Sequence, residues 1–143
     1  MKHLITSEDQ EFKNQVETCE FPVPQFDHRA HLRLAYVYLV QNNNTDESVQ
    51  LMREALTGLL KHAGVDPSVK YHETLTEAWI LAVHYFMNNT ENSSSADDFI
   101  KQHPVMLDSK IMLTHYSAEV LFSEEARQSF VEPNLDPIPR HGD

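Results

Sequence analysis

The chain has 143 residues, of which 41% are hydrophobic and 9% aromatic, enough for one domain with a core of its own. Its 22 acidic and 11 basic residues give a formal net charge of −11 at pH 7. Such a charge repels nucleic-acid backbones and anionic membranes, so we expect neither as a partner. The sequence shows neither a secretion signal nor an apolar run of membrane-spanning length, which favours a cytoplasmic location.

The composition favours long helices over a β-sandwich, because only three glycines are available for tight turns. The single cysteine, Cys19, also excludes an internal disulfide and a multi-cysteine zinc site. A first helix is predicted at about 7–19, with Ser7 as its N-cap and Gln10 completing a capping box. The prolines of "FPVPQ" end this helix.

Three longer helices are predicted next. The first, at about 28–41, is capped by Asp27 and carries apolar residues at helical spacing. The second, at about 46–63, is capped by Thr45 and closed by a glycine. The third, at about 69–88, is capped by a serine and holds the only tryptophan, in the stretch "YHETLTEAW". The link between each helix and the next is short, which makes them antiparallel.

The remaining chain predicts shorter pieces. Ser95 caps a helix at about 96–103, which closes before Pro104. Short helices are then expected at about 108–114, 117–122 and 124–130, followed by an extended proline-rich tail at about 131–143. The predicted fold class is therefore all-α: a single-domain helical bundle over 1–143, with three long antiparallel helices, several short ones and an extended tail.

Histidines are the candidate functional residues, since nine occur in the chain. His28 and His31 lie in the first turn of one predicted long helix, and His72 lies in the first turn of another. Because the antiparallel arrangement brings these two N-terminal ends together, the three histidines are expected at one end of the bundle. The C-terminal turn of the helix between them, with His62, reaches the same end, whereas His84 lies roughly 18 Å along its helix from His72.

Two histidines from one helix and a histidine or carboxylate from another are suited to a divalent transition metal: zinc, iron, nickel, manganese or copper. In this hypothesis His28, His31 and His72 are the ligands. An open coordination position would hold water or a small-molecule substrate, and the protein would then be an enzyme. The candidate catalytic residues, as general base, extra ligand or hydrogen-bond donors, are Glu73, His115 and Tyr71.

Three alternatives remain open from the sequence. Each histidine can be structural, packing its ring and hydrogen-bonding a carbonyl. The same end of the bundle can be a metal-free pocket for an anionic small molecule, because two helix N-termini favour an anion over a cation. The chain can also be a non-catalytic interaction or regulatory module that contacts a basic partner through its acidic faces.

The blocks "HRAHLRLA", "YHETLTEAW", "LTHYSAEVLFSEEAR" and "FVEPNLDPIP" span roughly 26–139. They resemble a family of small, uncharacterised bacterial all-helical proteins, and the most specific blocks are "HxxHL" and "YHETLT". The resemblance implies an all-helical fold and a family pattern that includes the histidines, Tyr71, Glu73 and Thr76. It implies no activity and no cofactor.

Overall fold

The computed structural model describes residues 2–138 and is built almost entirely from helices, as the sequence predicts. The longer helices are α1 (Ser7–Glu17), α2 (His28–Asn42), α3 (Thr45–His62), α5 (Glu73–Asn88) and α6 (Ala96–Gln102). The short helices are η1 (Val23–Gln25), α4 (Pro67–Lys70), η2 (Pro104–Leu107), η3 (Ser109–Thr114), α7 (Ala118–Leu121) and α8 (Glu124–Gln128). Two strands of two residues each, β1 (Lys2–His3) and β2 (Asn92–Ser93), pair in parallel and were not expected.

Local capping explains most helix boundaries. The side chain of Asp27 accepts the backbone N–H of Ala30 at 3.0 Å, which confirms its predicted role as the cap of α2. The capping box of α1 lies one residue earlier than expected, between Thr6 and Asp9. Asn44, rather than Thr45, caps α3, because its side chain accepts the N–H of Glu47. These shifts of one residue leave the packed faces of the helices unchanged.

The helix predicted at 69–88 is interrupted. Asp66, not Ser68, caps a single turn that forms α4, and the chain then becomes extended at Tyr71. The main helix, α5, begins only after His72, whose ring nitrogen Nδ1 accepts the N–H of Leu75. The histidine is therefore the N-cap rather than a first-turn residue, because an imidazole nitrogen can satisfy an unpaired helical N–H as a carboxylate does.

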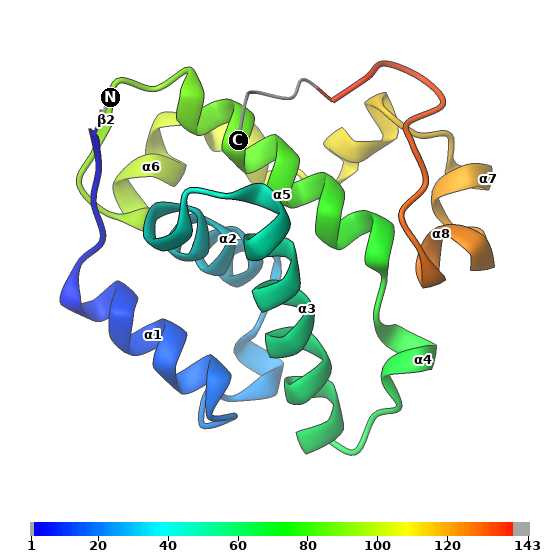
Figure 1. Cartoon of the computed structure of the whole chain (residues 1–143), viewed down its shortest axis with the longest axis horizontal. Coiled ribbons are helices and arrows are strands. Elements are labelled where there is room, and N and C mark those ends of the chain that lie inside the picture. Colours follow the sequence, from blue (N-terminus) through cyan, green and yellow to red (C-terminus); the bar gives the residue numbers. More distant parts are fainter. Residues whose placement is uncertain (1, 139–143) are drawn as a thin grey trace.

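The core is formed where α2, α3 and α5 contact one another, with α1 and α6 packed on α2. Figure 1 shows α5 crossing above α3, with α1 and α6 on one side and α7 and α8 on the other. A second cluster of buried side chains joins α5 to η3, α7 and Ile138. The predicted tail has no helix or strand in residues 131–138, and its last five residues lie outside the described chain.

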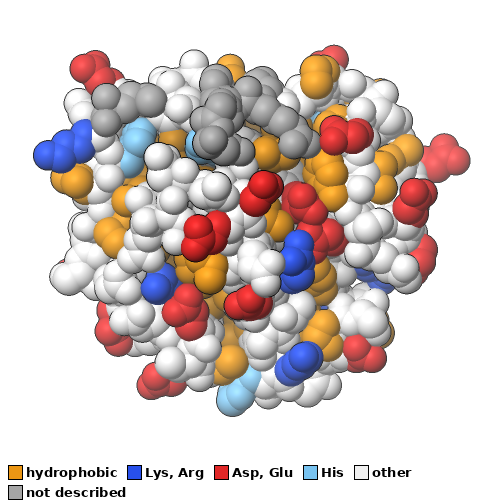
Figure 2. Space-filling model, in the orientation of Figure 1, with side chains coloured by type: hydrophobic (Ala, Val, Ile, Leu, Met, Phe, Trp, Pro, Cys, Tyr) orange, Lys and Arg blue, Asp and Glu red, His pale blue; other side chains and the backbone are white. Residues whose placement is uncertain are grey.

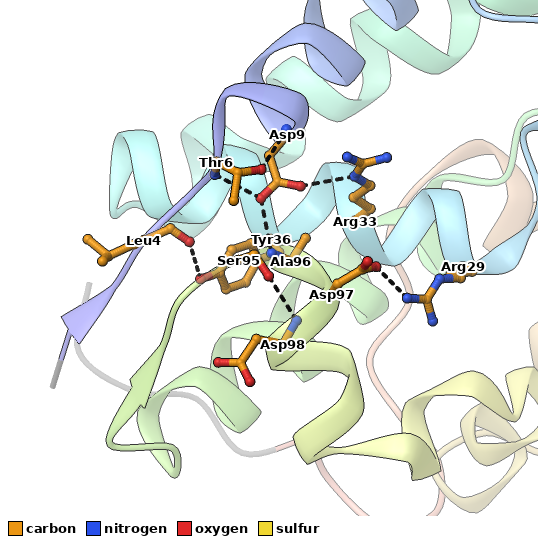
Figure 3. Close-up of polar contacts among 10 residues, drawn as sticks. All are labelled: Leu4, Thr6, Asp9, Arg29, Arg33, Tyr36, Ser95, Ala96, Asp97 and Asp98. Carbon is orange, nitrogen blue, oxygen red and sulfur yellow. Dashed lines mark hydrogen bonds and ion pairs between the residues drawn. The ribbon is translucent and has the colours of Figure 1, made fainter.

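The buried side chain of Asp9 connects α1, α2 and α6 (Figure 3). Its carboxylate is buried and accepts hydrogen bonds from the N–H groups of Thr6 and Ala96, each at 3.1 Å, and from Nε of Arg33 at 3.0 Å. Burial alone would raise its pKa, but these hydrogen bonds outweigh that effect and lower the pKa below the ordinary value. One side chain thus links α1, α2 and α6.

The surface agrees with the composition. Figure 2 shows acidic side chains spread over the visible face, with lysine and arginine side chains between them. Within residues 2–138, no helix has both the length and the apolar character needed to cross a membrane.

Candidate functional site

A cavity of about 680 Å³ lies where the start of α2, the C-terminal half of α3 and the start of α5 meet. Lys70 and Tyr71 close it between α4 and α5, and side chains from η3 and the end of α7 complete the wall. Its lining is mainly apolar. The buried part includes Leu32, Met52, Leu59 and Leu121, and the exposed part includes Leu113 and Phe122.

The predicted histidines His28, His31 and His72 all line this cavity, together with Tyr71. The antiparallel arrangement expected from the short links is the physical reason, because it places the N-terminal ends of α2 and α5 beside the C-terminal half of α3. The lining does not include His62, which is exposed at the end of α3.

His28 is fixed by a backbone contact and a ring contact. Its Nε2 donates to the carbonyl oxygen of Met106 at 2.8 Å, which connects α2 to η2. Its ring lies 4.7 Å from the ring of Trp79, centroid to centroid, in an edge-on arrangement. Because Nε2 must carry the proton to donate, the neutral ring has Nδ1 as its acceptor.

His31 is held one turn later. Its Nδ1 donates to the carbonyl oxygen of Asp27 at 2.9 Å, and its ring packs 4.5 Å from the ring of Phe26. Burial lowers the pKa of His31, and the nearby His28 lowers it further, although the bond to Asp27 opposes both effects. His31 is therefore neutral at pH 7, with Nε2 as an acceptor.

His72 uses both ring nitrogens within the fold. Nδ1 accepts the N–H of Leu75 at 3.1 Å, and Nε2 donates to the carbonyl oxygen of Leu121 at 2.7 Å. Burial lowers the pKa of His72, the contact with Leu121 opposes this, and the positive charge of Arg127 lowers it again. Neither nitrogen can bind a metal or a substrate without giving up a hydrogen bond that holds α5 or α7.

Glu73 lies outside the cavity. Its carboxylate forms two hydrogen bonds with Arg53, at 2.8 and 2.7 Å, and a third with the hydroxyl of Tyr71 at 2.8 Å. Burial would raise its pKa, but Arg53, Glu77 and Tyr71 together lower it to about 2. Glu73 lines a neighbouring cavity of about 490 Å³, and a carboxylate with so low a pKa is a weak general base.

His115, the third candidate catalytic residue, also lies outside the histidine cavity. Its Nδ1 donates to the carbonyl oxygen of Asp136 at 2.7 Å, and its own carbonyl accepts the N–H of Leu135. These bonds hold the proline-rich tail against η3. Of the three candidate catalytic residues, the structure brings only Tyr71 into the cavity with the histidines.

Within residues 2–138, no group of three or more histidine, cysteine, aspartate or glutamate side chains is arranged to hold a metal ion. The hydrogen bonds of the three predicted ligands are consistent with this absence. Both nitrogens of His72 form hydrogen bonds. Among contacts within the described part of the chain, His28 and His31 each keep one acceptor nitrogen, Nδ1 and Nε2 respectively.

Two cationic side chains of the cavity were not predicted from the sequence. Lys70, at the end of α4, and Lys110, in η3, both line it and are exposed. They are 40 positions apart, and no periodic pattern relates them. The signal that could have pointed to Lys70 is its position just before the "YHETLT" block.

Comparison of the chain with protein-family models, with curated proteins and with solved structures found no match in any of the three.

Proposed function

We propose that this protein binds a small, largely apolar molecule in the histidine-lined cavity. The observation that carries the proposal is the cavity itself: about 680 Å³, with apolar walls and three histidines among its lining residues. Ligand sites in proteins are typically concave, mostly apolar and roughly 300–1,000 Å³ in volume, with a few placed polar groups.

A packing defect is a poor explanation of a cavity of this size. Protein interiors are packed as densely as organic crystals, and voids larger than a water molecule are few. The cavity is also bordered by exposed apolar side chains, Leu113 and Phe122, which are 38% and 66% exposed. Exposed apolar surface next to a concave apolar wall is typical of a ligand site.

Binding is favoured over catalysis because His72 and Glu73 are already engaged in contacts within the fold. His72 holds the start of α5 and the end of α7, and the carboxylate of Glu73 is paired with Arg53. The acceptor nitrogens of His28 and His31 remain to orient a ligand through hydrogen bonds. The proposal therefore uses these two histidines as polar anchors in an apolar wall.

The test uses the only tryptophan, Trp79, which lines the cavity. The fluorescent probe N-phenyl-1-naphthylamine absorbs where tryptophan emits, so its binding should quench Trp79 by energy transfer. A Leu56→Phe/Leu60→Phe double variant enlarges two half-buried side chains of the wall and should weaken probe binding by about ten-fold or more.

The control variant is Leu4→Phe, at an exposed leucine that is not part of the cavity lining. It should bind the probe as the unmodified protein does. Absence of any Trp79 response to the probe, or equal binding by both variants, would overturn the proposal.

Metal binding stays a second hypothesis, because His28 and His31 line one cavity and each keeps an acceptor nitrogen. With His72 as the third ligand, a divalent transition metal would be expected after purification without a histidine tag. Elemental analysis and thermal shifts with zinc, iron, nickel, manganese and copper test it. Absence of metal together with no thermal shift would refute metal binding. The cytoplasmic location, a separate point, stays a prediction.

A further inference from the structure

The charged residues that line the cavity are mostly basic, whereas those of the whole chain are mostly acidic. The whole sequence has twice as many acidic as basic residues. Within residues 2–138, in contrast, the lining contains two lysines, Lys70 and Lys110, and a single carboxylate, Asp27. A carboxylate-poor, lysine-bearing cavity in a protein of net charge −11 is not expected from composition.

The one lining carboxylate has a structural task. Oδ1 of Asp27 accepts the N–H of Ala30 at 3.0 Å and so caps α2. Outside the lining, Asp108 accepts the backbone N–H of Lys110 at 3.0 Å and caps η3. Both carboxylates are thus tied to helix starts, and neither forms an ion pair with a lysine within residues 2–138.

Lys70 and Lys110 differ in this respect from the four arginines of the described chain. Arg29, Arg33, Arg53 and Arg127 each pair with a carboxylate: Asp97, Asp9, Glu73 and Glu124 respectively. Lys70 and Lys110 have no such partner within the described chain, so their charges are available to a ligand. Arg127 donates to the carbonyl of Val69 next to Lys70, but its own charge is paired with Glu124, so the two lysines carry the unpaired charge of the lining.

From these observations we propose that the ligand is an amphipathic monoanion, an apolar body that ends in one carboxylate. Its apolar body occupies the wall formed by Leu32, Met52 and Leu59, and its carboxylate lies at the exposed rim with Lys70 and Lys110. Ammonium groups supply the charge, since partial burial lowers the pKa of both His31 and His72 and leaves both neutral at pH 7. This proposal rests on the proposed function, because it specifies the ligand of the same cavity.

The experiment compares two probes of equal chain length, decanoate and decan-1-ol, by their competition with N-phenyl-1-naphthylamine at pH 7.5. Decanoate should displace the probe at a concentration about ten-fold lower than the alcohol. Added salt should narrow this difference, because the lysines are exposed and screened. A Lys70→Gln/Lys110→Gln variant should lose most of the preference for decanoate, a drop of about five- to ten-fold.

The matched control is Lys2→Gln/Lys101→Gln, which removes the same charge at two exposed lysines that do not line the cavity. It should keep the preference for decanoate. Equal displacement by both probes, or equal loss of preference in both variants, overturns the anion proposal while leaving the cavity as a binding site. Failure of the neutral probe itself to bind is a different result and refutes the proposed function.

Discussion

The Nε2 atom of His72 lies 2.7 Å from the carbonyl oxygen of Leu121, 49 residues away in the sequence. The same ring accepts the N–H of Leu75 through Nδ1 and begins α5. One imidazole therefore caps a long helix and holds the end of α7 at the cavity wall. His72, predicted as a metal ligand, thus has a structural role in the fold. Its contribution can be measured as a change in the free energy of unfolding.

Replacing His72 by alanine should lower the free energy of unfolding by about 2 kcal/mol, since both the cap and the bond to Leu121 are lost. Asparagine is a good N-cap but cannot reach Leu121 in the same way, so His72→Asn should restore about half of this loss. Urea denaturation of the three proteins measures the difference. Equal destabilisation by alanine and asparagine would show that the cap contributes nothing.

As the pH falls below 6.5, His31 should destabilise the protein at a pH still too high to protonate ordinary carboxylates. Burial holds the pKa of His31 below its ordinary value of 6.5, so the unfolded chain binds a proton more readily than the folded one. The stability contributed by the neutral ring is complete above pH 6.5 and is lost as the pH falls toward the folded pKa.

The variant His31→Gln removes this titration and should show a smaller loss of stability between pH 7 and pH 5.5. Denaturation midpoints measured at several pH values in that range provide the test. A parallel His62→Gln variant, at an exposed histidine outside the cavity lining, should keep the pH dependence of the unmodified protein. If the His31→Gln and His62→Gln curves coincide, the cavity histidine does not control the response.

The sequence predicted the helices better than the chemistry at their ends. Helical spacing of apolar residues located α2 and α3 to within one or two residues, because burial of an apolar stripe decides those segments. Caps and prolines located α1 and α6 equally well. The break between α4 and α5 could not be predicted, since it depends on a histidine ring acting as a cap. Short links likewise indicated that His28 and His72 line one end of the bundle.

The position of Glu73 shows why the candidate site was only partly predictable. Glu73 is the first residue of α5, directly after the N-cap His72, and its carboxylate pairs with Arg53 on α3 instead of lining the cavity with the histidines. Sequence spacing gives the face of a residue only when the first residue of the helix is known. Lys70 and Lys110 were missed for a simpler reason: they lie on short elements without periodicity.

The ion pair between Arg53 and Glu73 should be worth more than the pairs at the surface. Glu73 is buried, and Arg53→Ala would remove both hydrogen bonds that its carboxylate forms with Arg53. We expect a loss of about 2 kcal/mol, less than for a fully buried pair because Arg53 is partly exposed. Arg29→Ala, which breaks an exposed pair with Asp97, is the control and should change the unfolding free energy by about 0.5 kcal/mol or less.

Chemical denaturation at pH 7 distinguishes the two arginines. Similar small losses for Arg53→Ala and Arg29→Ala would mean that Glu73 is stabilised by other groups, such as the hydroxyl of Tyr71. A large loss for both would point to packing of the arginine stems rather than to charge.

Glu77 should make the protein less stable as the pH rises, because its carboxyl group is protonated in the folded state. Burial and the adjacent Glu73 raise the pKa of Glu77 to about 8, with Asp46 adding to the effect and Arg53 opposing it. Glu73 keeps the charge because Arg53 pairs with it, so the shared proton resides on Glu77. The folded state then binds this proton more tightly than the unfolded chain, whose ordinary pKa is 4.5.

The stability contributed by the protonated carboxyl is complete below pH 4.5 and is lost as the pH rises through about 8. Glutamine mimics the protonated group, so Glu77→Gln should become progressively more stable than the unmodified protein between pH 6 and pH 9. Glu47→Gln, at an exposed position of α3, changes the net charge equally and should show no such divergence. Parallel stability curves for the unmodified protein and Glu77→Gln over this range would mean that the two carboxyl groups share no proton.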